Sequence, residues 1–253
     1  MQKVCRKLWR HCVVHGFMRL FNTAGSRFYL AHRPDFATRL DREEMHRLFQ
    51  LWEHGQKGNN RGDWTRLFFL IANVESLMER AVPGAIAELG VYKGATAKIL
   101  NMLAPERSVY LFDTFSGFDE RDVKNDPSGT RPGRFNGSLD EVKQFVGTDA
   151  QVHYCKGVFP DTVSMVPNDE RFALVHLDCD LYEPTKAACE FFYKRLLPGG
   201  LLILHDYYSG CWPGVRQAVD EFLGDKPETL TLIPDKSGTA VLTKTAIKGR
   251  AFR

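Results

Sequence analysis

The amino-acid sequence predicts an α/β fold built on a mostly parallel sheet with helices on both faces. From about residue 85 onward, short apolar runs of strand length alternate with segments of helical period. Strands separated by helices imply right-handed crossovers and parallel pairing, and ligands of such sheets bind beyond the carboxyl ends of the strands. Acidic residues lie at or near the ends of four of the expected strands, namely Glu88, Asp113, Asp178 and Asp206.

The composition narrows the class of protein. A chain of 253 residues with 43% hydrophobic and 26% charged residues can bury a real core, which excludes disordered and collagen-like proteins. No apolar run approaches the roughly 20 residues that span a bilayer. The net charge of +3 is too small to indicate a nucleic-acid-binding protein. None of the six cysteines forms a C-x-x-C pair, and without a recognisable export signal they predict reduced thiols in a cytoplasmic protein.

Residues 1–80 are expected to form a helical extension or lid. Six apolar side chains between Val4 and Phe21 fall roughly on one helical face among basic residues, which is typical of an interfacial helix. Residues 1–34 are therefore a candidate for peripheral contact with the inner membrane surface. The alternative is a helix that packs on a partner subunit or on the catalytic domain. Helical spacing recurs in Arg42–Leu51 and Trp64–Arg80.

The second expected domain, residues 81–253, begins with a strand after a Pro-Gly turn. Ala85–Val91 is a β-like apolar run. Gly94–Leu103 follows as a helix with three apolar residues on one face. Val109–Phe112 is a second apolar run, which ends at Asp113 and predicts the second strand.

A polar, turn-rich segment, residues 116–138, follows the second strand. It is too long for a simple link, and we expect it to act as a lid over the ligand site at the carboxyl ends of the strands. Ser138 then starts a capping-box pattern, which predicts a helix to about Val146. The short run Val152–Cys155 predicts the third strand.

The remainder of the chain repeats the alternation and then closes with a hairpin. The fourth apolar run, Phe172–Leu177, ends at Asp178. A Pro-Gly-Gly turn at 198–200 precedes the fifth strand, which ends at His205-Asp206. The other elements expected here are a helix at Thr185–Leu196, the strand Leu201–Leu204, a helix at Val215–Leu223, and the hairpin strands Leu230–Ile233 and Ala240–Thr243.

A glycine-bearing turn joins the first strand to its helix within Glu88–Gly94. Glycines let the backbone approach a ligand, and the helix N-terminus offers free N–H groups to a carboxylate. Neither G-x-G-x-x-G nor G-x-x-x-x-G-K-[ST] occurs, so a nicotinamide dehydrogenase or a P-loop nucleotidase is disfavoured. Asp113 ends the next strand, where a carboxylate usually holds the ribose diol in nucleoside-binding α/β folds.

A second cluster of acidic residues follows the fourth and fifth strands. Asp178 and Asp180 are two positions apart, so an extended chain places both on one face. With Asp206 from the adjacent strand they form an oxygen-rich pocket suited to a hard divalent cation. Such a cation lowers the pKa of a bound hydroxyl, and a further carboxylate can take the proton.

These motifs resemble known methyltransferases. The acid-x-Gly-x-x-x-Gly pattern with an acid after the second strand resembles the class I S-adenosylmethionine-dependent methyltransferases. The stretch from Glu88 to Phe222 is similar to the macrocin O-methyltransferase (TylF-type) family, which methylates sugar hydroxyls on natural products and, in relatives, on glycans. The matching motifs are Pro83-Gly84 before Glu88–Gly94, Phe112–Phe118, Gly157–Thr162, Asp178–Tyr182 and Pro213–Phe222.

The resemblance implies a Rossmann-like class I methyltransferase fold with a seven-stranded sheet and an antiparallel C-terminal hairpin. It also implies that S-adenosylmethionine is the cofactor, with its ammonium group held by Glu88 and its methionine moiety facing the backbone of Gly90. A magnesium-type metal would be held by Asp178 and Asp206, with Asp180 as the general base. The implied cofactor contacts are Glu88, Gly90, Tyr92, Gly94, Asp113, Ser116, Gly157, Phe159 and Asp178.

The sequence departs from the family at one position, because the family's aspartate pair reads His205-Asp206 here. Three interpretations follow. His205 is a metal ligand, which favours a softer ion such as Mn, Fe or Zn. Alternatively, His205 is a base or positioning group at a site without metal. In the third interpretation His205 is a packed neighbour, and Asp178 and Asp206 alone hold magnesium.

The resemblance therefore implies metal-assisted O-methylation of a sugar hydroxyl on a glycan or glycosylated natural product. Two alternatives remain at this stage: a methyltransferase with a non-sugar acceptor, and a non-catalytic cofactor-binding subunit. The acidic residues retained at positions 178, 180 and 206 argue against the second alternative. The resemblance also implies a homo-oligomer.

Overall fold

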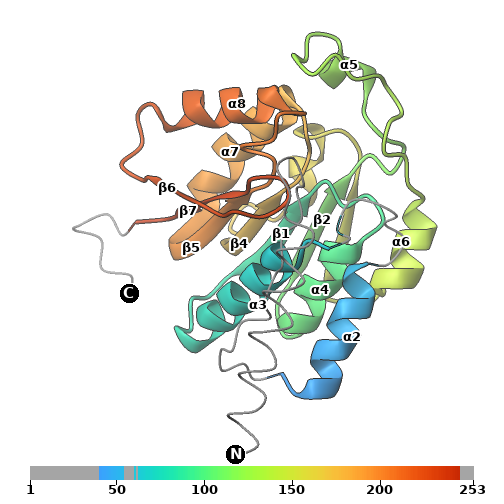
Figure 1. Ribbon diagram of the computed structural model, residues 1–253, viewed down its shortest axis with the longest axis vertical. Helices are drawn as coiled ribbons and strands as arrows, with labels where there is room; N and C mark the ends of the chain where they lie inside the picture. The colour runs from blue at the N-terminus through green and yellow to red at the C-terminus, as the bar shows by residue number, and fades with distance from the viewer. Residues whose placement is uncertain (1–39, 54–59, 61, 246–253) are drawn as a thin grey trace, which may run out of the picture. The chain divides into compact units, whose positions relative to one another are not determined.

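The computed structural model describes residues 40–53, 60 and 62–245. These residues form three layers, with a seven-stranded sheet between two layers of helices (Figure 1). The strand order is β3-β2-β1-β4-β5-β7-β6. The predicted α/β class and the mostly parallel seven-stranded sheet are confirmed.

Six strands of the sheet run in the same direction, and β7 alone runs opposite to them. The β1·β2, β1·β4, β2·β3 and β4·β5 pairs are parallel, whereas β7 pairs antiparallel with both β5 and β6. The carboxyl ends of β1, β2, β4 and β5 therefore lie at one edge, as the sequence predicted. The strands are β1 Ala85–Leu89, β2 Val109–Asp113, β3 Val152–Lys156, β4 Phe172–Leu177, β5 Leu196–Leu204, β6 Leu230–Leu232 and β7 Ala240–Thr243.

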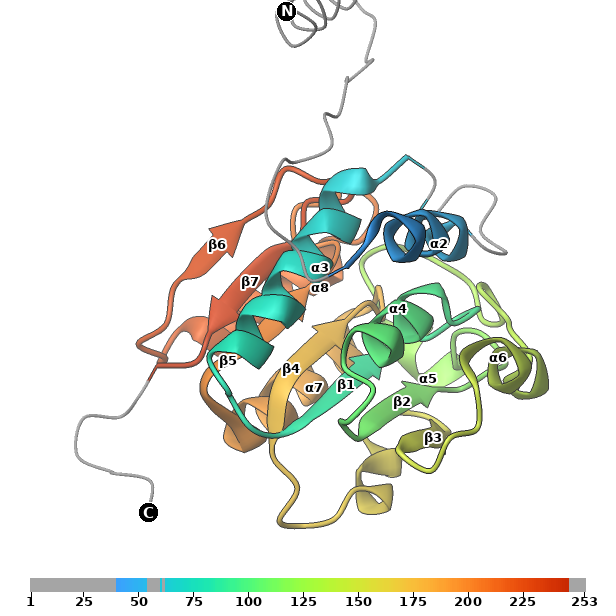
Figure 2. The same ribbon diagram turned by 90° about the horizontal axis from the view of Figure 1, so that it is seen from below.

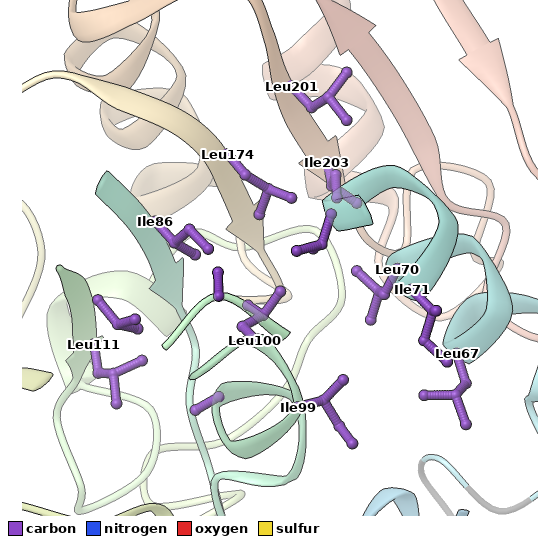
Figure 3. Close-up of a cluster of buried hydrophobic side chains, with 14 of the residues drawn as sticks. Leu67, Leu70, Ile71, Ile86, Ile99, Leu100, Leu111, Leu174, Leu201 and Ile203 are labelled. Atoms are coloured by element: carbon purple, nitrogen blue, oxygen red, sulfur yellow. The ribbon is translucent and has the colours of Figure 1, made fainter. Parts of the chain in front are cut away.

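One helical layer covers one face of the sheet with a continuous apolar core. Figure 2 shows α3 and α4 crossing in front of the strands on this face. Figure 3 shows Leu70 and Ile71 of α3 facing the same cluster as Leu100 of α4 and Ile203 of β5. The helices of this layer are α2 Arg42–Trp52, α3 Trp64–Glu79, α4 Ala95–Leu103 and α6 Leu139–Val146.

The opposite face of the sheet is covered by α7 Tyr182–Arg195 and α8 Pro213–Leu223. Their apolar side chains pack with those of β1, β2, β4 and β5 that point to this side. Side chains alternate between the two faces of a strand, so both cores draw on the same strands. Both faces of the central strands are therefore buried, as expected for a parallel sheet.

Several boundaries differ from the sequence-based expectation. β5 begins at Leu196 rather than Leu201, because the Pro-Gly-Gly stretch stays paired as an irregular part of the strand. α7 begins at Tyr182 rather than Thr185, since a proline is tolerated in the first turn of a helix. Two short elements were not predicted, α5 Glu120–Val123 and the 3₁₀ helix η1 Asp161–Met165.

The N-terminal prediction is met only in part. The helices expected at Arg42–Leu51 and Trp64–Arg80 are present as α2 and α3, and both pack in the same core as the sheet. The division at residue 80 stays a prediction, and residues 1–34 lie outside the described residues. Within the described ranges, no helix is long and apolar enough to cross a membrane.

Candidate functional site

A cavity of about 350 Å³ opens at the carboxyl ends of the strands. This volume is within the usual range of small-molecule sites. Ten of the residues predicted from the sequence line it. On the expected cofactor side these are Glu88, Gly90, Tyr92, Asp113, Gly157 and Phe159; on the expected catalytic side they are Asp178, Asp180, His205 and Asp206.

Two predicted cofactor residues do not line the cavity. Gly94 is the N-cap of α4, and a Cβ atom there would overlap the side chain of Val146. Ser116 is exposed, and its backbone N–H donates to Oγ1 of Thr114. Both residues shape the loops around the cavity rather than its wall.

Glu88 lies buried at the end of β1 and keeps one carboxyl oxygen free. Nδ1 of His176 lies 3.0 Å from its Oε1, whereas Oε2 has no hydrogen-bond partner among the described residues. Burial, reinforced by the charge of Asp178, raises the pKa of Glu88 well above its usual value. Burial also lowers the pKa of His176 to about 3, so this histidine is neutral. An unpartnered buried carboxyl oxygen is costly, and it fits a hydrogen-bond-donating ligand such as an ammonium group.

Asp113 lines the cavity and also ties two turns together, while its predicted contact with the ribose stays a prediction. Its Oδ2 accepts hydrogen bonds of 2.8 Å from the backbone N–H groups of both Val91 and Tyr92. Its Oδ1 accepts a 2.7 Å bond from the N–H of Phe115. The carboxylate thereby fastens the turn after β1 to the turn after β2, and most of its acceptor capacity is used within the protein.

Gly90 is required by the close approach of two strands. It adopts φ +91°, and a Cβ atom would overlap the backbone carbonyl of Asp178. The backbone N–H of Asp178 in turn donates to the carbonyl of Leu89 at 2.8 Å. The glycine therefore sets the distance between the cofactor-side turn and the acidic cluster.

Asp178, His205 and Asp206 form a compact group of potential metal ligands. Nδ1 of His205 lies 2.8 Å from Oδ1 of Asp178 and 2.7 Å from Oδ2 of Asp206. All three ligand atoms lie within 4.8 Å of one another. Two carboxylate oxygens and one ring nitrogen are thereby brought together at the cavity wall, a donor set that can hold a metal ion. Nδ1 and Nε2 of His205 are both buried without a hydrogen-bond partner of good geometry in the described structure, although Nδ1 lies close to the two carboxylates.

The charges of this cluster are strongly coupled. Burial by itself raises the pKa of Asp178, but His205 and Arg66 outweigh it and hold that pKa well below the usual value. Burial and Arg66 lower the pKa of His205, yet the two aspartates outweigh them and raise it to about 9. The histidine is thus a cation between two carboxylates when no metal is bound.

Asp180 faces the cavity beside this cluster. Burial, followed by repulsion from Asp178 and Asp206, raises the pKa of Asp180 well above its usual value. The carboxyl also hydrogen-bonds to Asp206, and Arg134 opposes the upward shift. A carboxyl with a raised pKa next to a candidate cation site is a candidate for proton transfer, and the role of Asp180 as general base stays a prediction.

The segment 116–138 folds over the cavity, although its movement as a lid stays a prediction. Phe118 and Phe135 contact each other and Trp212 through ring packing at 5.5–6.1 Å between centroids. Phe118, Phe135 and Arg134 all line the cavity. The guanidinium of Arg134 lies 4.8 Å from the ring centroid of Phe135 and 4.9 Å from that of Trp212.

Sequence analysis missed several residues of the cavity wall. Arg66 and Asn60 come from the N-terminal part of the chain, and Lys236 and Ser237 from the tip of the β6–β7 hairpin. Their positions follow from tertiary packing, and a lone arginine in an amphipathic helix gives no local signal. Trp212 and Arg134 also line the cavity, and no motif of the sequence assigned them to it.

The backbone is strained around the cavity. Within the described residues, six that are not glycine have positive φ, and four of them line it: Tyr92 (50°), Phe135 (58°), Asp180 (65°) and Asp206 (60°). Such conformations cost energy for side chains of this kind, and they concentrate at functional sites.

Comparison with protein families shows one match over most of the chain. The model of the family described as macrocin-O-methyltransferase (TylF) matches residues 61–233. The matched region contains every residue of the acidic cluster and of the cofactor-side turns.

Three curated relatives were found. Mycinamicin III 3''-O-methyltransferase of Micromonospora griseorubida is 30% identical over 166 residues, covering 59% of this chain and 64% of the relative. A rhamnosyl-tetracenomycin-C 4'-O-methyltransferase of Streptomyces olivaceus is 32% identical, covering 60% and 62%. The chain therefore spans less than two thirds of the length of these two relatives. Demethyldecarbamoylnovobiocin O-methyltransferase of Streptomyces niveus is 30% identical over 214 residues, covering 76% and 78%.

Solved structures support the same relationship. The structure of the O-methyltransferase NovP superposes with a TM-score of 0.64 at 27% identity, covering 72% of this chain and 80% of that protein. The apo structure of a TDP-rhamnose 3'-O-methyltransferase of calicheamicin biosynthesis gives a TM-score of 0.54 at 26% identity, covering 81% and 96%.

Proposed function

Because this chain belongs to the macrocin O-methyltransferase (TylF) family, we propose that it is an S-adenosylmethionine-dependent O-methyltransferase of a sugar hydroxyl. The relatives named above are O-methyltransferases, and three of them carry the name of a glycosylated natural product or a nucleotide-linked sugar. The observation that carries the proposal is the cavity itself, where Glu88 and the group Asp178–Asp180–Asp206 face one space.

S-adenosylmethionine fits the residues on one side of this cavity, where it would supply a sulfonium methyl group. The free Oε2 of Glu88 is suited to accept from the amino-acid ammonium group. Tyr92 and Phe159 offer apolar surface, and the turn held by Asp113 supplies the shape of the wall. Binding of a cation beside Glu88 would lower the raised pKa of this carboxyl.

A divalent metal fits the donor set on the other side. Asp178, Asp206 and His205 would hold it, in keeping with the convergence of their ligand atoms. A bound cation there would lower the pKa of an acceptor hydroxyl and offset the repulsion that raises the pKa of Asp180. Because His205 would provide a nitrogen ligand, this site would favour Mn²⁺ relative to Mg²⁺, compared with a site made of oxygen ligands alone.

The protein's own contribution is proton removal and alignment. Asp180 would accept the proton of the acceptor hydroxyl, whose oxygen would take the methyl group that the cofactor supplies; the carbon–sulfur bond would break and S-adenosylhomocysteine would remain as the second product. Orientation of the two reactants accounts for much of the rate in such bimolecular reactions. Phe118, Phe135 and Trp212 roof the cavity and reduce the access of water to it.

Titration calorimetry with S-adenosylmethionine tests this proposal, first with Mn²⁺ or Mg²⁺ and then with EDTA. We expect cofactor binding in both conditions and methyl transfer only with metal. The acceptor screen should contain TDP-sugars, glycosylated macrolides and phenolic small molecules, read by mass spectrometry. Absence of cofactor binding would remove the methyltransferase assignment. Transfer to phenols alone would replace the sugar by a non-sugar acceptor.

A further inference from the structure

Arg66 is a buried guanidinium in the first turn of α3, with only 2% of its surface exposed. Arginine is almost never fully buried unless it is paired. Its Nη1 donates to Oδ2 of Asp178 at 3.3 Å, and its Nη2 donates to Oδ1 of Asn60. Its Nε lies 3.4 Å from Oδ2 of Asp63, and its Cζ lies 5.0 Å from the ring centroid of Trp52.

The groups that hold Arg66 are themselves fixed without the help of Asp178. Nε1 of Trp52 donates to the carbonyl of Asp63 at 3.1 Å. Oδ1 of Asp63 accepts from the backbone N–H groups of Arg66 at 3.3 Å and of Lys236 at 3.4 Å. The guanidinium is therefore oriented by this N-terminal cradle, Trp52, Asn60 and Asp63, and reaches Asp178 from a fixed position.

This contact makes the two oxygens of Asp178 unequal. Oδ2 is engaged by Arg66, whereas Oδ1 lies beside Nδ1 of His205 in the candidate metal cluster. The side chain of Asp178 is 24% exposed, toward the cavity. Bidentate coordination by this carboxylate would need the oxygen that Arg66 holds.

We infer that Arg66 is a positioning residue that holds Oδ2 of Asp178, so that only Oδ1 is available to a bound cation. Ca²⁺ commonly takes bidentate carboxylates and six to eight ligands, whereas Mg²⁺ takes an octahedron of single oxygens and keeps several waters. One-oxygen ligation by Asp178 therefore favours the smaller ion. The inference rests on the metal site of the proposed function.

The test compares the Kd values for Mg²⁺ and Ca²⁺ in titration calorimetry of the full chain, for the wild type and for Arg66→Met. Loss of a nearby positive charge tightens the binding of both dications similarly, so the charge effect largely cancels in the ratio of the two affinities. The effect of releasing Oδ2 of Asp178 does not cancel in this ratio, because a second carboxylate oxygen favours Ca²⁺ over Mg²⁺. We expect the ratio to move toward Ca²⁺ by about tenfold, the lower end of the usual effect of residues that orient metal ligands.

Two further variants make the result decisive. Arg66→Lys keeps the positive charge but loses the planar guanidinium that donates to Asp178 and Asn60. It should move the ratio of affinities in the same direction by a smaller factor, and it tests the inference if Arg66→Met does not fold. Arg107→Met removes a partly buried arginine that donates to the carbonyls of Val82 and Gly84, outside the cavity. This control should lower the melting temperature and leave the ratio unchanged.

An unchanged ratio in folded Arg66 variants would overturn the inference, since a merely structural ion pair affects stability and not ion preference. Failure of the wild-type chain to bind either ion would overturn it as well. Titration of S-adenosylmethionine on the same wild-type chain separates that outcome from a failure of the proposed function, because the ammonium group is proposed to bind at Glu88, on the other side of the cavity.

Discussion

The carboxylate of Asp126 accepts a 2.8 Å hydrogen bond through Oδ2 from the backbone N–H of Tyr182, the first residue of α7. The N-cap of this helix, Leu181, provides no side-chain hydrogen bond. An acid from the segment over the cavity thus caps a helix that begins two residues after Asp180. The position of that segment and the geometry around Asp180 are coupled through one carboxylate.

Replacement of Asp126 by Ala should loosen the segment 116–138. Loss of a helix cap costs about 1 kcal/mol, and a buried N–H left without an acceptor adds about as much. We expect a lower melting temperature and faster cleavage of this segment in limited proteolysis. Ser128→Ala, which removes a contact only to Oδ1 of the same carboxylate, should have a smaller effect. Equal cleavage rates in wild type and Asp126→Ala would contradict the coupling.

Asp180→Asn should abolish turnover and leave cofactor affinity nearly unchanged. A missing general base lowers rates by roughly 10²–10⁴-fold. Methyl transfer is measured with the acceptor found in the screen, and affinity for S-adenosylmethionine by calorimetry. The exposed Asp169→Asn is the control and should be fully active. Retained turnover in Asp180→Asn would remove this residue from the role of base.

Asp113→Asn should weaken both the fold and the cofactor site. The carboxylate accepts from three backbone N–H groups through its two oxygens, whereas asparagine has one oxygen and one NH₂ group. At least one backbone N–H therefore loses its acceptor, and each unsatisfied donor costs about 1–3 kcal/mol. We expect a lower melting temperature together with weaker S-adenosylmethionine binding in calorimetry. If Asp113 bound only the ribose, affinity would fall with no change in melting temperature.

Asp122→Asn should raise thermal stability at pH 7 but not at pH 4. Burial, followed by repulsion from Asp119, raises the pKa of Asp122 to about 6 from its ordinary 3.8. The folded state therefore holds this proton more tightly than the unfolded state, and its stability falls as the pH rises from about 4 to 6. Asparagine avoids this loss. Melting curves across that interval provide the measurement, and the exposed Glu120→Gln, in the same helix, is the matched control.

The sheet and the position of the acids were predictable because they follow from local patterns. Short runs of alternating or continuous apolar residues indicate strands. The right-handed crossover between parallel strands then brings Glu88, Asp178 and Asp206 to one edge of the sheet. The hairpin was predictable from its turn residues. Short elements such as α5 and η1 were missed because four or five residues carry no measurable period.

The functions of individual residues were less accessible than their positions. Gly90 looked like a ligand-facing glycine, and only the structure shows that the carbonyl of Asp178 requires it. Asp113 stands at the position of a ribose-binding carboxylate, but its backbone partners depend on how two loops meet. Arg66 reaches the cluster because α3 packs against the sheet, a tertiary contact that no spacing within the helix encodes.

The four cavity-lining residues with positive φ limit how this protein can be made more resistant to heat. At Phe135, for example, glycine would adopt the observed φ of 58° without steric conflict, so Phe135→Gly removes a strain of about 1 kcal/mol. The same change deletes a ring of the cavity roof. Sequence optimisation guided by backbone preference alone would select such replacements, yet the lost packing of the Phe135 ring on Phe118 and Trp212 costs more than the relieved strain, and the reaction would also slow. Thermostabilising libraries should therefore keep Tyr92, Phe135, Asp180 and Asp206 fixed and draw their changes from elsewhere in the fold.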